Sequence, residues 1–168
     1  LTMSEFEINK VTKGRRDYCN TNGKKTEKLY ADIVRGRGRK VVKSSKYDDI
    51  HKHIDFYVDN MSVDVKGDRH LDCIWLETVN VNGDKGWLQG EAQFIVFDIK
   101  ELNSFCCFKR EDLLRFVQQH VIEYTDNKKD YMKFYTRAKW GKKDEIVKVK
   151  YSNIKHLQKG LLNYEVYR

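Results

Sequence analysis

Asp55, Asp64 and Lys66 are the residues of this chain whose types and spacing could do chemistry. We expect residues 53–58 and 63–67 to form paired strands, in a register that places the two acids opposite each other. Directly opposed residues have Cβ atoms roughly 5 Å apart, so the two carboxylates repel. A divalent cation relieves this repulsion, because Mg²⁺ binds one or two carboxylates together with water and substrate phosphate. These residues predict a metal-dependent site for phosphodiester cleavage.

A hairpin is predicted because apolar and polar residues alternate in both segments. Asp59 and Asn60, which lie between the segments, tolerate the left-handed backbone of a tight turn. A hairpin closed on this turn makes Val58 face Met61, and counting back places Asp55 opposite Asp64 and His53 opposite Lys66. We expect His53 to lie beside the acids, in a structural or DNA-facing role rather than as a metal ligand.

A third acid, Glu27, lies on a predicted helix over residues 24–35, which Gly36 and Gly38 end. Apolar residues follow Glu27 at helical spacing, so its carboxylate is expected at the edge of the buried stripe. An acid in this position either reaches solvent or meets a cation. Both alternatives are open for Glu27.

The order Glu27, Asp55, Asp64-x-Lys66 resembles the PD-(D/E)XK nuclease superfamily, and within it the Holliday-junction resolvases and small phage nucleases. This chain has Ile54 where the family commonly has proline. The resemblance implies a restriction-endonuclease-like α/β (α+β) fold, a mixed central sheet flanked by helices. It also implies that Asp55, Asp64 and the Val65 carbonyl hold Mg²⁺ (or Mn²⁺). Glu27 then binds a second metal or a bound water, and Lys66 orients the attacking water.

The function implied by the resemblance is a Mg²⁺-dependent endonuclease acting on branched or otherwise structured DNA. Three alternatives remain: a non-catalytic nucleic-acid-binding protein, an RNA endonuclease, and a protein-interaction module such as a viral anti-defence factor. An ordinary charged face on a hairpin would also account for the pattern. The resemblance further implies a homodimer if the substrate is a junction.

The rest of the chain predicts one domain over residues 1–168, with a catalytic core at about 23–100. A basic C-terminal segment at about 110–168 is expected to extend the same sheet. We expect residues 73–79 to form a strand of the same sheet, residues 94–97 a buried strand, and residues 110–120 a helix. Polar residues in these segments and in the connection over 87–93 are secondary site candidates: Glu77, Gln89 and Gln93.

Lys and Arg exceed acids, giving a formal net charge of +8, which favours a polyanionic partner, DNA more than RNA. Residues 128–159 contain eleven Lys or Arg and three acids, interspersed with aromatic residues that could stack on unpaired bases. A solvated basic strand is the alternative. The predicted DNA contacts are Arg37, Arg39, Lys40, Lys139, Lys142, Lys143, Lys148 and Lys150.

The four cysteines lack the spacing of a metal site, and adjacent Cys106 and Cys107 would point to opposite faces of a strand. Reduced thiols fit an intracellular protein. No signal-peptide pattern and no apolar run of membrane-spanning length is visible, so we expect a cytoplasmic protein without membrane contact, in the host cytoplasm if the source is a phage.

Overall fold

The computed structural model describes residues 5–165, with side chains from residue 20 onwards. Six strands form the first sheet, in the order β1-β2-β3-β5-β6-β10. Strand β3 pairs antiparallel with β2 and parallel with β5, so the sheet is mixed, as predicted. The strands are β1 (Val41–Lys43), β2 (Phe56–Val58), β3 (Met61–Arg69), β5 (Phe94–Ile99), β6 (Ser104–Lys109) and β10 (Gln158–Asn163).

A second sheet has the order β4-β9-β8-β7. Its strands are β4 (Ile74–Val79), β9 (Glu145–Val149), β8 (Phe134–Thr136) and β7 (Tyr124–Thr125). The prediction that residues 73–79 and the basic C-terminal segment extend the first sheet was therefore wrong, apart from β10. Alternation of apolar residues predicts which face of a strand is buried, but it does not predict which strand pairs with it. The partner of β4 is β9, which lies far away in the sequence.

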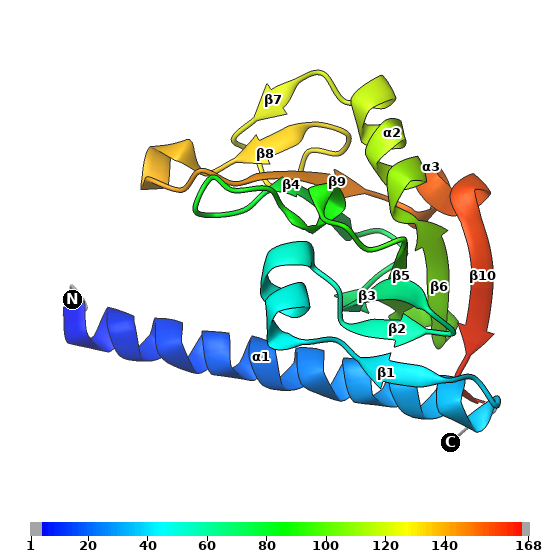
Figure 1. Ribbon diagram of the computed structural model, residues 1–168. Coiled ribbons are helices and arrows are strands. Elements are labelled where there is room, and N and C mark those ends of the chain that lie inside the picture. Colours follow the sequence, from blue (N-terminus) through cyan, green and yellow to red (C-terminus); the bar gives the residue numbers. More distant parts are fainter. Residues whose placement is uncertain (1–4, 166–168) are drawn as a thin grey trace.

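Helices lie on both faces of the first sheet, as predicted (Figure 1). Helix α1 (Glu5–Gly36) packs against β3 on one face, while the second sheet, α2 (Arg110–His120) and α3 (Tyr151–Ile154) lie on the other. Short helices are η1 (Asp48–Lys52), η2 (Trp87–Gln89), η3 (Lys100–Leu102), η4 (Ala138–Trp140) and η5 (Lys155–Leu157). Helix α1 starts well before the predicted residue 24, and its N-terminal half extends beyond the sheet (Figure 1).

Two hydrophobic clusters hold these layers together. One lies between the two sheets and α2, and includes Ile95, Phe97 and Phe108, while the other lies beneath α1 and includes Val65 and Val96. Alternation along β5 and β6 supplies both clusters, because successive side chains of a strand point to opposite faces. Cys106 belongs to the first cluster and Cys107 packs against the second, as predicted for adjacent strand residues.

The contact of α1 with β3 depends on a glycine. A Cβ added to Gly67 would lie 2.9 Å from Thr26 Oγ1, so any larger residue pushes the helix away from the strand. Thr26 and Gly67 are the immediate neighbours of Glu27 and Lys66 in the sequence. The close approach therefore sets the distance between the helix that carries Glu27 and the strand that carries Lys66.

Substitution of Gly67 by Ala is expected to lower the free energy of unfolding by about 1–3 kcal/mol, the usual effect of overpacking. Gly23→Ala is the matched control, because a Cβ there meets nothing within 4 Å and α1 should gain about 0.5–1 kcal/mol. Urea unfolding measures both. Adding Thr26→Ala to Gly67→Ala should recover part of the loss, and additive effects in the double variant would contradict the proposed clash.

Candidate active site

The predicted hairpin is confirmed, with the predicted register from the turn back to Asp55. Asp59 and Asn60 form the turn with φ angles of 46° and 69°, and Val58 pairs with Met61. The Asp55 N–H donates to the Val63 carbonyl at 2.9 Å, which continues the pairing one residue beyond β2.

The two strands separate at Asp55. The Val65 N–H donates at 2.7 Å to Asp55 Oδ2, a side-chain oxygen in place of a backbone carbonyl. The predicted pairing of His53 with Lys66 is therefore wrong. Residues 48–52 form a π-helix, and His53 ends it with a φ angle of 54°, so the backbone turns away before it reaches the strand.

Asp55 and Asp64 are both buried, with exposed fractions of 7% and 2%. Lys66 Nζ lies 2.9 Å from Asp64 Oδ1. Asp64 Oδ2 is buried and has no hydrogen-bond partner among the described residues. Burying a carboxylate oxygen without a partner destabilises the folded state, so the stability of the fold does not explain this arrangement.

Burial and the closeness of the two carboxyl groups change the acidity of the pair. Burial, followed by the nearby charge of Asp64, raises the pKa of Asp55 to about 7, although the hydrogen bond from Val65 opposes the shift. The pKa of Asp64 is also raised by burial, against the attraction of Lys66. The metal-free pair therefore resists carrying two negative charges at neutral pH, and a bound cation would remove this resistance.

Glu27 lies near this pair but has its own partner. Its carboxylate is 2.9 Å from Lys43 Nζ, at the end of β1. Burial raises its pKa, and the charge of Asp55 adds to the shift, so Glu27 and Asp55 are close enough to interact. Within the described part of the chain, however, no three His, Cys, Asp or Glu side chains are gathered tightly enough to hold a metal ion. The structure brings together two of the three predicted acids.

A pair of carboxylates is a sufficient protein contribution for Mg²⁺, which usually keeps several waters and takes its remaining ligands from the substrate. Asp64 Oδ2 has no hydrogen-bond partner among the described residues, and Asp55 lies beside it, so these two carboxylates would be the protein ligands of such an ion. The residues present therefore fit a hydrated Mg²⁺ with few protein ligands. They do not fit a site closed by protein side chains alone.

Sequence reasoning missed two residues around this pair. Trp87 of η2 is buried, and the Lys66 ammonium lies 5.2 Å from the centroid of its ring, which restrains the lysine by a cation–π contact. Arg69 is half-buried at the end of β3, and its positive charge lowers the pKa of Asp64. Arg69 was detectable as a second cation on the strand of Asp64 and Lys66, whereas nothing local links Trp87 to the site.

The secondary candidates have structural hydrogen bonds. Gln93 Oε1 accepts the Ser62 N–H at 2.9 Å, which joins the start of β3 to the connection before β5. Gln89 Nε2 donates to the Thr78 carbonyl at 2.7 Å, and Glu77 Oε1 accepts the Trp87 N–H at 3.4 Å. These bonds hold η2 against β4 and thereby position Trp87 near Lys66. The side chains of Glu77, Gln89 and Gln93 are therefore engaged with the backbone of the fold.

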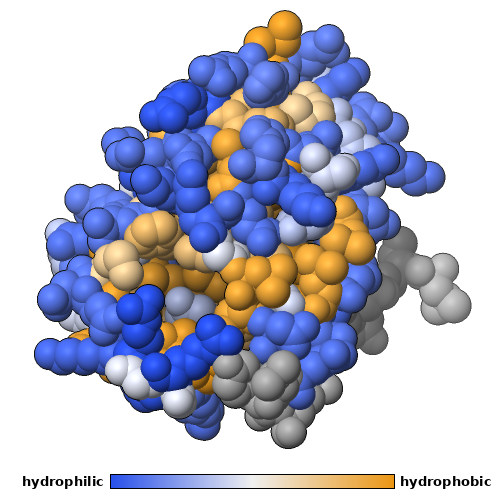
Figure 2. All heavy atoms as spheres, turned by 90° about the vertical axis from the view of Figure 1, so that its right-hand side faces the viewer, coloured by the Kyte–Doolittle hydropathy of each residue, from blue (hydrophilic) through white to orange (hydrophobic). Residues whose placement is uncertain are grey.

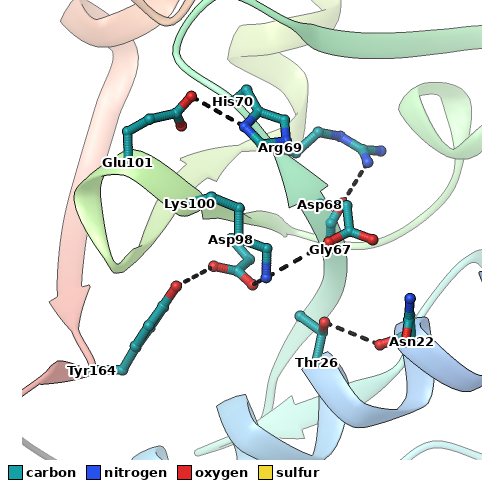
Figure 3. Close-up of polar contacts among 10 residues, drawn as sticks. All are labelled: Asn22, Thr26, Gly67, Asp68, Arg69, His70, Asp98, Lys100, Glu101 and Tyr164. Carbon is teal, nitrogen blue, oxygen red and sulfur yellow. Dashed lines mark hydrogen bonds and ion pairs between the residues drawn. The ribbon is translucent and has the colours of Figure 1, made fainter.

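A second polar cluster, absent from the sequence-based predictions, lies at the ends of β3 and β5 (Figure 3). Asp98 is buried, accepts a hydrogen bond from the Tyr164 hydroxyl at 3.0 Å and lies 2.7 Å from Lys100 Nζ. Both oxygens of this carboxylate have partners, in contrast to Asp64. The cluster therefore attaches the segment after β10 to β5, and we assign it a structural role.

The predicted DNA contacts fall in two separate regions. Arg37, Arg39 and Lys40 follow α1, whereas the lysines of the C-terminal segment lie on or near η4 and β9, at the other end of the molecule (Figure 1). Lys148 of β9 and Lys150, which directly follows β9, lie on the same side of the chain, as predicted. Their ammonium groups lie 4.5 Å and 5.0 Å from the ring centroid of Tyr131. Lys139, Lys142 and Lys143 are exposed.

Among the described residues, no helix combines the length and the apolar character that crossing a membrane requires. Comparison of the chain with models of protein families, with curated proteins and with solved structures finds no match.

Proposed function

We propose that this protein is a Mg²⁺-dependent nuclease that hydrolyses phosphodiester bonds in DNA, and that it acts as an endonuclease on branched or otherwise structured DNA. The observation that carries the proposal is the buried pair Asp55–Asp64 with a carboxylate oxygen that lacks a partner and a lysine ammonium 2.9 Å from its other oxygen. The mixed sheet and the order of α1, β1, β2 and β3 also fit the resemblance to PD-(D/E)XK nucleases.

In the proposed mechanism, Asp55 and Asp64 hold the ion, with the Val65 carbonyl as a further ligand. When bound, Mg²⁺ or Mn²⁺ supplies an acidified water and neutralises charge on the phosphate. Lys66 orients the attacking water and stabilises the charge that develops on the phosphate oxygens. Glu27, paired with Lys43, binds a water molecule or a second ion at the edge of the site.

The formal net charge of +8 supports DNA as the partner, because phosphate contacts by Lys and Arg supply most of the affinity of such proteins. Tyr131, between Lys148 and Lys150, offers a ring for an unpaired base beside two cations. A substrate that also reached Arg37 and Arg39 would extend across the molecule, as an arm of branched DNA can. If the substrate is a four-way junction, two strands must be cut, and a homodimer with two active sites would fit that task.

One observation favours a second candidate function, a protein that binds nucleic acid without cutting it. The described residues gather two acids and not three around the site, so the chain could bind nucleic acid without cutting it. Such a protein would bind DNA equally well with Mg²⁺ and with EDTA. A catalytic protein would give products only with the metal.

The test is a cleavage assay on end-labelled substrates of matched sequence: a four-way junction, linear duplex DNA, single-stranded DNA and RNA. Each is incubated with Mg²⁺, with Mn²⁺ or with EDTA. We expect cleavage of the junction with either metal, slower cleavage of linear DNA, and none with EDTA. Binding without products on any substrate would overturn the nuclease in favour of the non-catalytic candidate, and cleavage of RNA alone would overturn DNA as the substrate.

A further inference from the structure

A groove of about 440 Å³ lies between the C-terminal half of α1 and the first sheet, on the face opposite Asp64. Helix α1 covers only part of this face, and strands β2, β3, β5, β6 and β10 form the floor beside it. Figure 2 views the side of the molecule that carries β10 and shows apolar surface there, bordered by hydrophilic residues. Cavities of this size and apolar character are typical of small-molecule sites.

The floor of the groove is apolar. Val34 of α1 and Val58 and Val63 of the sheet are buried beneath it, while Met61 and Phe94 are partly exposed at its surface. A ligand with a hydrocarbon tail would bury this exposed surface without desolvating a polar group. Burial of apolar area contributes roughly 25 cal/mol per Å², so a tail of several carbons suffices for measurable binding.

The rim of the groove is basic. Arg37, Arg39, Lys109 and Lys159 line it, and the lining contains no acid. Arg39 pairs with Asp59 at 3.0 Å and Lys159 lies 3.9 Å from Asp112, both near the surface where such pairs contribute little. Lys109 is exposed and has no ion pair among the described residues. The rim therefore attracts an anionic group.

From this combination we infer that the groove binds a small amphipathic anion, a long-chain monocarboxylate with its tail on the apolar floor and its carboxylate at Lys109 and Arg37. The volume of the groove, about 440 Å³, favours a small molecule, because small-molecule pockets typically measure about 300–1,000 Å³. The site is independent of the Asp55–Asp64 pair, so it requires neither metal nor nucleic acid.

Decanoate is the probe, and methyl NMR of protein labelled at its methionines is the measurement. Met61 lines the groove, while Met132 packs against the core between the two sheets and serves as the internal control. We expect decanoate to shift the Met61 methyl signal with a dissociation constant on the order of 0.1 mM, as ligands of this size allow. Acetate at equal concentration should leave the signal in place, because it lacks the tail. Decyltrimethylammonium should shift the signal more weakly than decanoate does, because its head group carries the wrong charge for the basic rim.

Two variants test the parts of the site. Gly160 lines the groove, and a Cβ added there meets only Cys107 at 3.8 Å, so Gly160→Leu fills the groove without a backbone clash and should weaken binding at least tenfold. Lys109→Gln should weaken it about threefold to tenfold. Lys155→Gln, an exposed lysine outside the groove, should leave it unchanged.

The inference fails if millimolar decanoate leaves the Met61 signal unmoved, or if decyltrimethylammonium shifts it as strongly as decanoate does. An unchanged affinity in Gly160→Leu would also overturn it. Should Gly160→Leu fail to fold, the comparison of the two head groups and the Lys109→Gln variant decide the question. Loss of nuclease activity has no bearing on these outcomes.

Discussion

Exchange of Asp64 for Asn is expected to lower the rate of Mg²⁺-dependent cleavage by a factor on the order of 10³, equivalent to about 4 kcal/mol of transition-state stabilisation. The amide keeps the size of the side chain but cannot balance the charge of a divalent ion. The buried oxygen that now lacks a partner, Asp64 Oδ2, is the atom on which this expectation depends. The concentration of Mg²⁺ needed for half-maximal rate should rise as well.

Lys66→Met should give the opposite effect on metal binding. Removal of the ammonium that lies 2.9 Å from Asp64 Oδ1 leaves a more negative site, so less Mg²⁺ should be needed for half-maximal rate. The maximal rate should still fall about 10²-fold to 10³-fold, because the charge developing on the phosphate loses a cation. A titration of cleavage rate against Mg²⁺ separates the two variants.

Asp98→Asn is the matched control for this series. Asp98 has the same exposed fraction as Asp64, 2%, and lies on the neighbouring strand β5, but both of its oxygens already have partners. Its substitution should reduce stability and leave the rate per folded molecule unchanged. Full activity in both Asp64→Asn and Lys66→Met would contradict the proposed active site.

The hairpin could be predicted because everything that forms it is local. Alternation of apolar residues gave the two faces of each strand, and Asp59-Asn60 gave the turn, which fixes the register from Val58–Met61 onward. The helix over 110–120 was predicted with its observed bounds, because its apolar stripe and acidic first turn are also local.

Contacts between distant segments could not be predicted in this way. The pairing of β4 with β9 creates a second sheet, and no local pattern distinguishes it from an extension of the first. Trp87 lies beside Lys66 because Gln89 and Glu77 hold η2 against β4. Tyr164 bonds to Asp98 across 66 positions of sequence. Each of these contacts depends on tertiary packing, which alternation and turn residues do not encode.

The second large effect is expected in the stability of the metal-free protein. Asp55→Asn should increase the free energy of unfolding at pH 8, while it abolishes cleavage. In the folded protein the pKa of Asp55 is about 7, compared with an ordinary value of 3.8. Because one pKa unit corresponds to about 1.36 kcal/mol, ionisation of Asp55 costs the folded state up to about 4 kcal/mol. Asn avoids this cost and keeps an acceptor for the Val65 N–H.

The direction with pH follows from the raised pKa. Below the unfolded pKa of 3.8 the carboxyl is protonated in both states and contributes no penalty. As the pH rises towards 7, the unfolded state ionises first, so stability is lost across this window and stays low above it. Urea unfolding at pH 5 and pH 8 in EDTA should therefore show a steeper loss in the wild type than in Asp55→Asn.

Asp59→Asn, on the exposed turn of the same hairpin, is the control and should leave the stability almost unchanged at both pH values. Mg²⁺ supplies a further comparison. Because only the ionised pair binds a cation, Mg²⁺ should raise the melting temperature of the wild type at pH 8, have little effect at pH 5, and have none on Asp55→Asn. If the Asp55 carboxylate instead stabilised the folded protein, the opposite results would be expected. Asp55→Asn would then be less stable than the wild type at pH 8, and Mg²⁺ would stabilise neither protein.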